Sequence, residues 1–291
     1  VFTEAVKLIE SKSYDKASAI LEPLSYDENA GVAAKANFLI GYINTRWDNK
    51  NKNSQLAKRS LLSNINSAYP QPYAYIWYAD VEDDINIATN YLKKGIQRFP
   101  KEPKLYEAML QYSTEKNTIV EEIKSQGFDD VFLLGKAISY LITAQQLDNI
   151  LLFASRIRNG NELEKEDDMY LTLIEAYARL FGSSPDYKLS HDGFYRVLEW
   201  DTNNRFAYAH YVGIIYTLIK LGDTMKATEY FDRLPLRNSL FDLSDGPCPM
   251  GIYFEFEAVY KTIFDEIKRL FSNDPKRKKK ACVIYILYLC Y

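Results

Sequence analysis

His191 and His210 are the two histidines of this 291-residue chain, and their side chains titrate near neutral pH, as acid–base catalysis requires. They fall on different predicted elements. His191 follows a loop, whereas His210 lies among aromatic residues of a predicted helix. Catalysis at either position would require a nucleophile or a metal ion brought close by the fold. We therefore interpret both as packed or hydrogen-bonded residues of a scaffold.

Paired carboxylates are the second group of residues that could do chemistry. A glycosidase needs two carboxyl groups about 5–10 Å apart in a cleft, and spacing along the chain does not establish such a pair. Most of the pairs fall near predicted helix starts, where a carboxylate accepts hydrogen bonds from free backbone N–H groups. We therefore expect them to cap helices. The pairs are Asp83 and Asp84, Glu121 and Glu122, Asp129 and Asp130, and Asp167 and Asp168.

The sequence lacks the common signatures of catalytic and metal sites. The nucleotide-binding patterns G-x-G-x-x-G and G-x-x-x-x-G-K-[ST] do not occur, nor do H-E-x-x-H and G-x-S-x-G. Cys248, Cys282 and Cys290 form no C-x-x-C pair and have no histidine nearby in sequence, which disfavours a zinc site. We predict a protein that is not an enzyme and that uses no cofactor or metal ion.

One dense basic block occurs in a chain whose net charge is only −3. Such a block suits a phosphate, an anionic lipid surface or nuclear import, and the alternative is a solvated turn before a buried last helix or strand. The apolar segment that follows it, Ala281–Tyr291, is shorter than the roughly 18–20 residues that a transmembrane helix needs. The basic residues are Lys276, Arg277, Lys278, Lys279 and Lys280.

We expect a soluble, cytoplasmic protein, and the balanced charge gives no reason to expect a nucleic-acid partner. Residue 1 is Val rather than Met, so a removed signal peptide or upstream domain stays open.

The elements that must position these residues are predicted to be helices. Gly and Pro, at 12 and 10 residues, are too few for a turn-rich sandwich. Tyr14, Ala17 and Leu21 share one helical face, and similar spacing recurs almost throughout. The pattern predicts hairpins of two helices. Predicted helices beyond the first hairpin are Ser54–Tyr69, Asn86–Phe99, Glu107–Tyr112, Phe132–Leu141, Leu147–Ile157, Met169–Phe181, Phe194–Trp200, Tyr208–Lys220 and Thr224–Leu234.

Several hairpins carry the same residue types at the same places. Leu221–Ala227, followed by Phe231, resembles the middle of a tetratricopeptide repeat, in which a Gly-Asp turn precedes a helix with a small residue and then an aromatic one. The small residue lets two helices approach closely, and a proline ends the hairpin. The resemblance covers roughly residues 1–235, and no repeat carries the full pattern. Further matches are Ser13–Ala17 with Leu21, Ala88 with Pro100, Ile40 with Gly41, and Leu134 with Gly135.

We therefore expect an all-α fold, and the resemblance implies a right-handed α-solenoid of stacked antiparallel hairpins. The predicted domains are a solenoid of about six to seven hairpins over 1–235, a loop with a capping helix over 236–272, and a basic turn with an apolar segment over 273–291. The loop is Arg237–Gly251, and the capping helix is Ile252–Phe271. Long connections at Arg46–Asn53 and Gly182–His191 predict an irregular solenoid. The alternative is a generic all-α domain.

In the resembled family, the first helix of each hairpin lines a concave groove that holds extended peptides or partner helices. Groove residues come in pairs four positions apart, so both members point the same way. Aromatic side chains suit such a surface because they bury area at low entropy cost. The corresponding residues here are Phe38, Tyr42, Tyr73, Trp77, Glu107, Gln111, Phe132, Lys136, Leu171, Glu175, Val212 and Tyr216.

The resemblance implies a non-enzymatic scaffold that binds a protein or peptide. Of the groove positions only Lys136 is basic, which disfavours the family's charged clamp for a C-terminal carboxylate. Two other functions stay open. One is a membrane-surface-associated regulator that acts through the basic block and the apolar segment, and the other is a small-molecule receptor with a pocket inside the solenoid. The oligomeric state also stays open.

Overall fold

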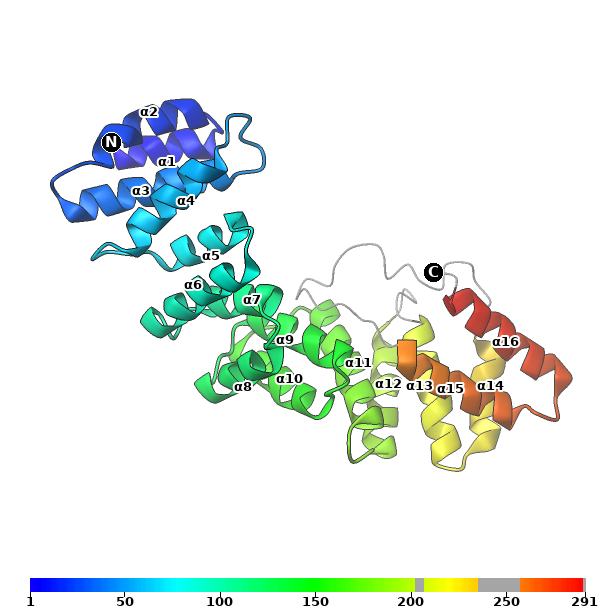
Figure 1. The fold of residues 1–291 in the computed structure, drawn as a ribbon. Coiled ribbons are helices and arrows are strands. Elements are labelled where there is room, and N and C mark those ends of the chain that lie inside the picture. The colour runs from blue at the N-terminus through cyan, green and yellow to red at the C-terminus, as the bar shows by residue number, and fades with distance from the viewer. Residues whose placement is uncertain (202–206, 235–256, 290–291) are drawn as a thin grey trace. The chain divides into compact units, whose positions relative to one another are not determined.

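Helices form the regular structure of the residues that the computed structural model describes, 1–201, 207–234 and 257–289. Within these ranges sixteen α-helices follow one another, and no strand occurs among them (Figure 1). The prediction of an all-α fold is therefore confirmed. The chain divides into two compact units, Val1–Phe128 and Asp129–Tyr291, which we describe separately. The predicted domain boundaries at 235 and 272 stay predictions.

The first unit is a row of helices in which each packs against the next along the chain. Helix α5 also packs against α3 and α7, its neighbours two places away. Contacts with neighbours one and two places away are what a row of antiparallel hairpins produces. The helices are α1 (Phe2–Glu10), α2 (Tyr14–Leu24), α3 (Ala30–Thr45), α4 (Ser54–Ile65), α5 (Pro72–Val81), α6 (Ile85–Arg98), α7 (Pro103–Tyr112) and α8 (Lys116–Gln126).

The second unit repeats this pattern from α9 to α14, where each helix packs against the next. Helix α13 also packs against α11 and α15, and α15 packs against α16. The helices are α9 (Val131–Thr143), α10 (Asp148–Gly160), α11 (Lys165–Phe181), α12 (Tyr187–Trp200), α13 (Ala207–Lys220), α14 (Thr224–Arg233), α15 (Glu257–Leu270) and α16 (Pro275–Leu289).

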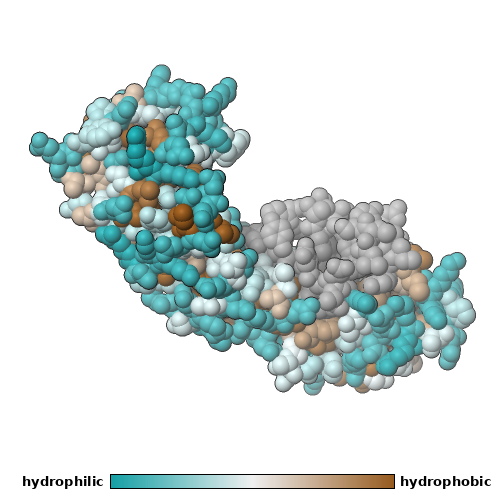
Figure 2. Space-filling model, in the orientation of Figure 1, coloured by the Kyte–Doolittle hydropathy of each residue, from teal (hydrophilic) through white to brown (hydrophobic). Residues whose placement is uncertain are grey.

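The small residues singled out in the sequence lie in the helix–helix contacts. Ala17, Ala88 and Ala227 are all fully buried, as are the large residues Leu21 and Phe231 that follow two of them by four positions. The faces drawn in Figure 2 are mostly hydrophilic, with small apolar patches. Both observations fit amphipathic helices whose apolar sides face one another.

Two glycines permit the closest helix approaches. A Cβ atom on Gly41 of α3 would lie 2.6 Å from Leu61 Cγ of α4, and one on Gly213 of α13 would lie 2.5 Å from Phe194 Cζ of α12. Both distances are far below van der Waals contact, so each backbone touches the facing side chain directly. Gly41, matched in the sequence together with Ile40 to a Leu-Gly pair, lies at one of these close contacts.

Helix capping explains two of the four carboxylate pairs. Asp84 Oδ1 accepts a hydrogen bond of 2.8 Å from Asn86 N at the start of α6, and Asp130 Oδ1 accepts one of 2.8 Å from Leu133 N at the start of α9. Asp167 and Asp168 lie in the first turn of α11, where a negative charge interacts favourably with the helix dipole. Glu121 and Glu122 lie inside α8, so the expectation of a helix start was wrong there.

Several predicted boundaries differ from the structure. Helix α12 begins at Tyr187, so the connection expected over Gly182–His191 is shorter, because Asp186 caps α12 by accepting from Leu189 N. The basic residues Lys276–Lys280 lie in the N-terminal part of helix α16, where the sequence predicted a connecting turn. The predicted capping helix corresponds to α15 over Glu257–Leu270, and the predicted loop Arg237–Gly251 lies outside the described residues.

Candidate functional site

Four of the predicted groove residues meet in one aromatic cluster on the first unit. Phe38 and Tyr42 lie one turn apart on α3, and Tyr73 and Trp77 lie one turn apart on α5. Because α3 packs against α5, the rings converge on Trp77. Its ring centroid is 4.8 Å from that of Phe38, 4.4 Å from that of Tyr42 and 5.8 Å from that of Tyr73. We call these four residues the aromatic cluster.

The aromatic cluster is partly open to solvent. Tyr73 is 41% exposed, and Phe38, Tyr42 and Trp77 are half-buried. The guanidinium carbon of Arg46 lies 5.5 Å from the centre of the Tyr42 ring, where the cation is attracted to the ring face. Such a surface offers large, rigid rings and a positive edge to an incoming chain.

The turn after α3 carries an exposed aromatic side chain that the sequence prediction missed. Trp47 is 79% exposed and follows Arg46 directly. The turn is held in place because Asn49 Nδ2 donates to Ile43 O at 3.0 Å and Asn53 N donates to Asn44 Oδ1 at 3.0 Å. A tryptophan within a long polar turn was the available signal.

An acidic residue anchors the same turn to the first hairpin. Asp48 accepts a hydrogen bond of 2.9 Å from the Tyr14 hydroxyl, and Lys12 Nζ lies 3.1 Å from its other carboxylate oxygen. Burial opposes ionisation of Asp48, but the hydrogen bonds from Lys12 and Tyr14 outweigh it and hold the pKa of this carboxyl below its usual value. The turn that presents Trp47 is therefore fixed at both ends.

The two groove residues predicted on α7 differ in exposure. Glu107 is buried, and its Oε1 lies 2.6 Å from Lys104 Nζ on the same helix. Gln111 is exposed. Helix α7 packs against α5, so both residues lie on the helix next to Trp77.

The groove residues predicted in the second unit separate into two kinds. Phe132 and Lys136 on α9 are exposed. Glu175 is 7% exposed and Tyr216 is 6% exposed, so neither offers a contact surface. The buried Leu171 and Val212 belong to the core as well.

Glu175 and Tyr216 both contact side chains of neighbouring helices. Glu175 pairs with Arg158 of α10, whose guanidinium also donates to Asp168 Oδ1 at 2.7 Å and to Thr172 Oγ1 at 2.8 Å. The Tyr216 ring stacks on Phe181 with centroids 5.6 Å apart. These contacts hold helices together.

The basic block is divided by the fold. Arg277 donates to both carboxylate oxygens of Asp232 at 2.9 and 2.7 Å, and Lys280 Nζ donates to Phe231 O at 2.8 Å, so both join α16 to the end of α14. Lys276, Lys278 and Lys279 are exposed. Anion binding by these three residues stays a prediction.

The two histidines differ in their environment. His191 Nδ1 lies 3.1 Å from Thr217 Oγ1. The His210 ring is fully buried, and this burial lowers its pKa to about 4 although Asp201 Oδ2 is 3.7 Å away. Within the described ranges, no group of three or more His, Cys, Asp or Glu side chains is placed to hold a metal ion, and no helix has the length and apolar content to span a bilayer.

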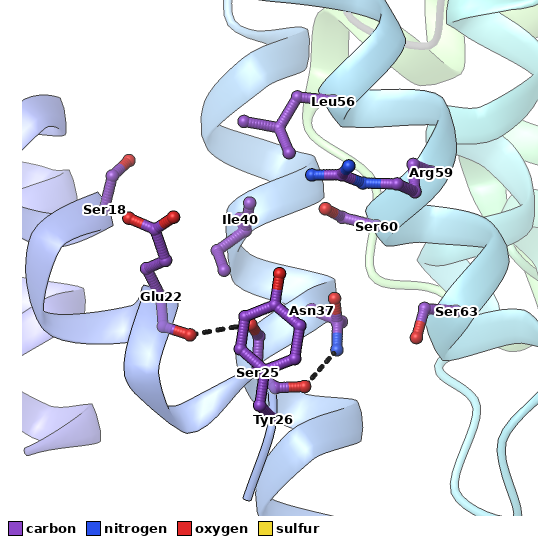
Figure 3. Close-up of a pocket in the computed structure, with 10 residues that line it drawn as sticks. All are labelled: Ser18, Glu22, Ser25, Tyr26, Asn37, Ile40, Leu56, Arg59, Ser60 and Ser63. Carbon is purple, nitrogen blue, oxygen red and sulfur yellow. Dashed lines mark hydrogen bonds between the residues drawn. The ribbon is translucent and has the colours of Figure 1, made fainter.

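A pocket on α2, α3 and α4, lined by polar and apolar side chains, is the second site that the sequence prediction missed (Figure 3). Its volume is about 410 Å³, within the range of small-molecule sites. It forms from three separate helices, so no local pattern marks it. The lining residues are Ser18, Glu22, Ser25, Tyr26, Asn37, Ile40, Leu56, Arg59, Ser60 and Ser63.

A scan against models of known protein families finds no match, and a search of curated proteins finds no significant relative. The resemblance to tetratricopeptide repeats therefore rests on this chain's own residues.

Proposed function

We propose that the chain is a tetratricopeptide-like, right-handed α-solenoid that binds an extended segment of a protein partner across the aromatic cluster. It acts as a scaffold and not as an enzyme. Support for the repeat architecture comes from helices that contact neighbours one and two places away within each unit, and from the buried small residues Ala17, Ala88 and Ala227.

The aromatic cluster is the observation that carries the proposed function. Positions chosen by repeat spacing on two different helices place Phe38, Tyr42, Tyr73 and Trp77 around one another, and the cluster remains partly exposed. Contiguous apolar side chains that stay open to solvent mark interaction sites more often than single exposed ones do. Tryptophan and tyrosine are also the residues that most often dominate binding energy at protein interfaces.

The proposal is tested by selecting peptides from a displayed random library on the full chain and measuring their affinities. We expect Trp77→Ala to weaken binding about 30-fold and Tyr73→Ala to weaken it about fivefold, because these rings form the contact surface. Tyr195→Ala is the matched control and leaves affinity unchanged, because Tyr195 on α12 is as exposed as Tyr73, at 41%, and lies in the other unit.

Because Trp77 is half-buried, its removal also loosens the contact between α3 and α5. Tyr73→Ala, at a more exposed ring, separates binding from folding. Thermal unfolding followed by circular dichroism verifies that both variants remain helical. Failure to select any binding peptide contradicts the proposal. So do folded Tyr73→Ala and Trp77→Ala variants that bind as tightly as the unaltered chain.

A further inference from the structure

We infer that the pocket formed by α2, α3 and α4 is a binding site for a small zwitterion that carries one carboxylate and one ammonium group, as a free amino acid does. This inference goes beyond the proposed function, because the pocket uses another face of the helix. Asn37 and Ile40 lie on roughly the opposite side of α3 from Phe38 and Tyr42, since successive residues are rotated by about 100° around a helix axis.

Three helices each contribute one face to the pocket. Ser18 and Glu22 lie one turn apart on α2, and Arg59 and Ser63 lie one turn apart on α4. Figure 3 shows the Glu22 carboxylate and the Arg59 guanidinium reaching into the space from opposite walls, with Ile40 between them. The pocket therefore combines polar and charged side chains on α2 and α4 with two apolar side chains, Ile40 and Leu56.

The two charges define the class of ligand. Glu22 and Arg59 are the charged residues among those that line the pocket, so the lining is neutral overall but strongly dipolar. Neither side chain has an ion-pair or hydrogen-bond partner among the described residues. A carboxylate suits the planar fork of Arg59, and an ammonium group suits Glu22, so one zwitterion satisfies both.

Uncharged polar groups complete the site. Asn37 Nδ2 donates to Ser25 O at 3.1 Å and to Ala33 O at 3.0 Å, which fixes the amide and leaves its Oδ1 toward the space in Figure 3. Ser60 is only 3% exposed, yet its hydroxyl has no hydrogen-bond partner among the described residues and lies at the pocket wall. A buried serine in a helix ordinarily bonds to a nearby carbonyl, so this hydroxyl is available to a ligand.

The test uses the full chain and the twenty common L-amino acids, each measured singly at millimolar concentration by saturation-transfer NMR and then by calorimetry. We expect at least one of them to bind. Arg59→Met keeps an unbranched stem but removes the donor fork, and Glu22→Gln keeps the shape but removes the charge. Each variant is expected to weaken binding by about tenfold or more.

Lys16→Met is the matched control, because Lys16 is an exposed cation on α2 that does not line the pocket, and binding should be unchanged in it. Circular dichroism verifies the fold of each variant. Succinate, putrescine and glucose probe the class of ligand. The inference is overturned if no amino acid binds, if binding survives both pocket variants, or if one of these three compounds binds more tightly than every amino acid.

Discussion

Helices α3 and α5 of the first unit and helices α11 and α13 of the second give opposite results at positions chosen by the same repeat spacing. In the first unit, Phe38, Tyr42, Tyr73 and Trp77 form a partly exposed aromatic cluster. In the second unit, Glu175 and Tyr216 are buried by Arg158 and Phe181. Helical spacing thus decides which side chains share a face, but the neighbouring helices decide whether that face stays open.

Helix α11 shows why the face closes in the second unit. Every residue from Leu171 to Ala178 is buried, so this helix is covered on all sides by α10, α12 and α13. A helix buried all round has no side left for a partner. In contrast, α5 has an exposed residue near each end, Tyr73 and Asp80.

The largest expected loss of stability follows from breaking the ion pair between Arg158 and Glu175 in the second unit. Arg158→Met leaves Glu175 and Asp168 without their main partner, and we expect the free energy of unfolding to fall by about 2–4 kcal/mol, because a buried carboxylate loses its compensating charge. Glu175→Gln, which can still accept a hydrogen bond, should cost less. Denaturant titration measures both. Equal and small losses would mean that Glu175 is not held by Arg158.

Glycine contacts provide a matched comparison between the units. Gly213→Ala pushes a methyl group into the Phe194 ring, which is fully buried and rigid, and should cost about 2–3 kcal/mol despite the better helix propensity of alanine. Gly41→Ala meets Leu61, whose side chain bends more easily, and should cost about 1 kcal/mol. Thermal and denaturant unfolding report the difference. The reverse order would refute the tighter packing inferred for α12 and α13.

Protonation of His210 should lower the stability of the second unit. The first unit contains no histidine, so it should not show this effect. The pKa of His210 falls from 6.5 to about 4 on folding, so the unfolded chain binds more protons between these values. The contribution of neutral His210 to the free energy of unfolding is fully present above about pH 6.5 and is lost as the pH falls toward 4. We expect a loss of about 2 kcal/mol between pH 7 and pH 5.

The comparison variant for this effect is His210→Phe, which keeps a ring but cannot titrate. Its free energy of unfolding should vary less between pH 7 and pH 5 than that of the unaltered chain. Identical pH dependence in both would show that another group is responsible.

Local patterns in the sequence predicted the features that depend on one or two adjacent helices. The resemblance picked out Phe38, Tyr42, Tyr73 and Trp77, which the structure brings together, and spacing within each helix put each pair on one face. The start of α12 at Tyr187 was missed because its cap, Asp186, lies in a stretch rich in turn residues.

Features that join distant parts of the chain could not be predicted in this way. Arg277 binds Asp232 forty-five residues away, so part of the basic block joins two helices and does not form a free surface. Arg59 and Glu22 face one space only because α2 and α4 both flank α3. The burial of Glu175 likewise depends on Arg158 of another helix.

The most direct measurement is the fluorescence of Trp77 as the single tryptophan of the chain. Trp47→Phe and Trp200→Phe together leave Trp77 as the reporter at the centre of the aromatic cluster. Peptides selected on the unaltered chain should shift its emission with the same affinity that calorimetry gives, and Tyr73→Ala should weaken both signals together. Saturating peptide that binds by calorimetry but leaves the Trp77 emission unchanged would show that binding occurs elsewhere.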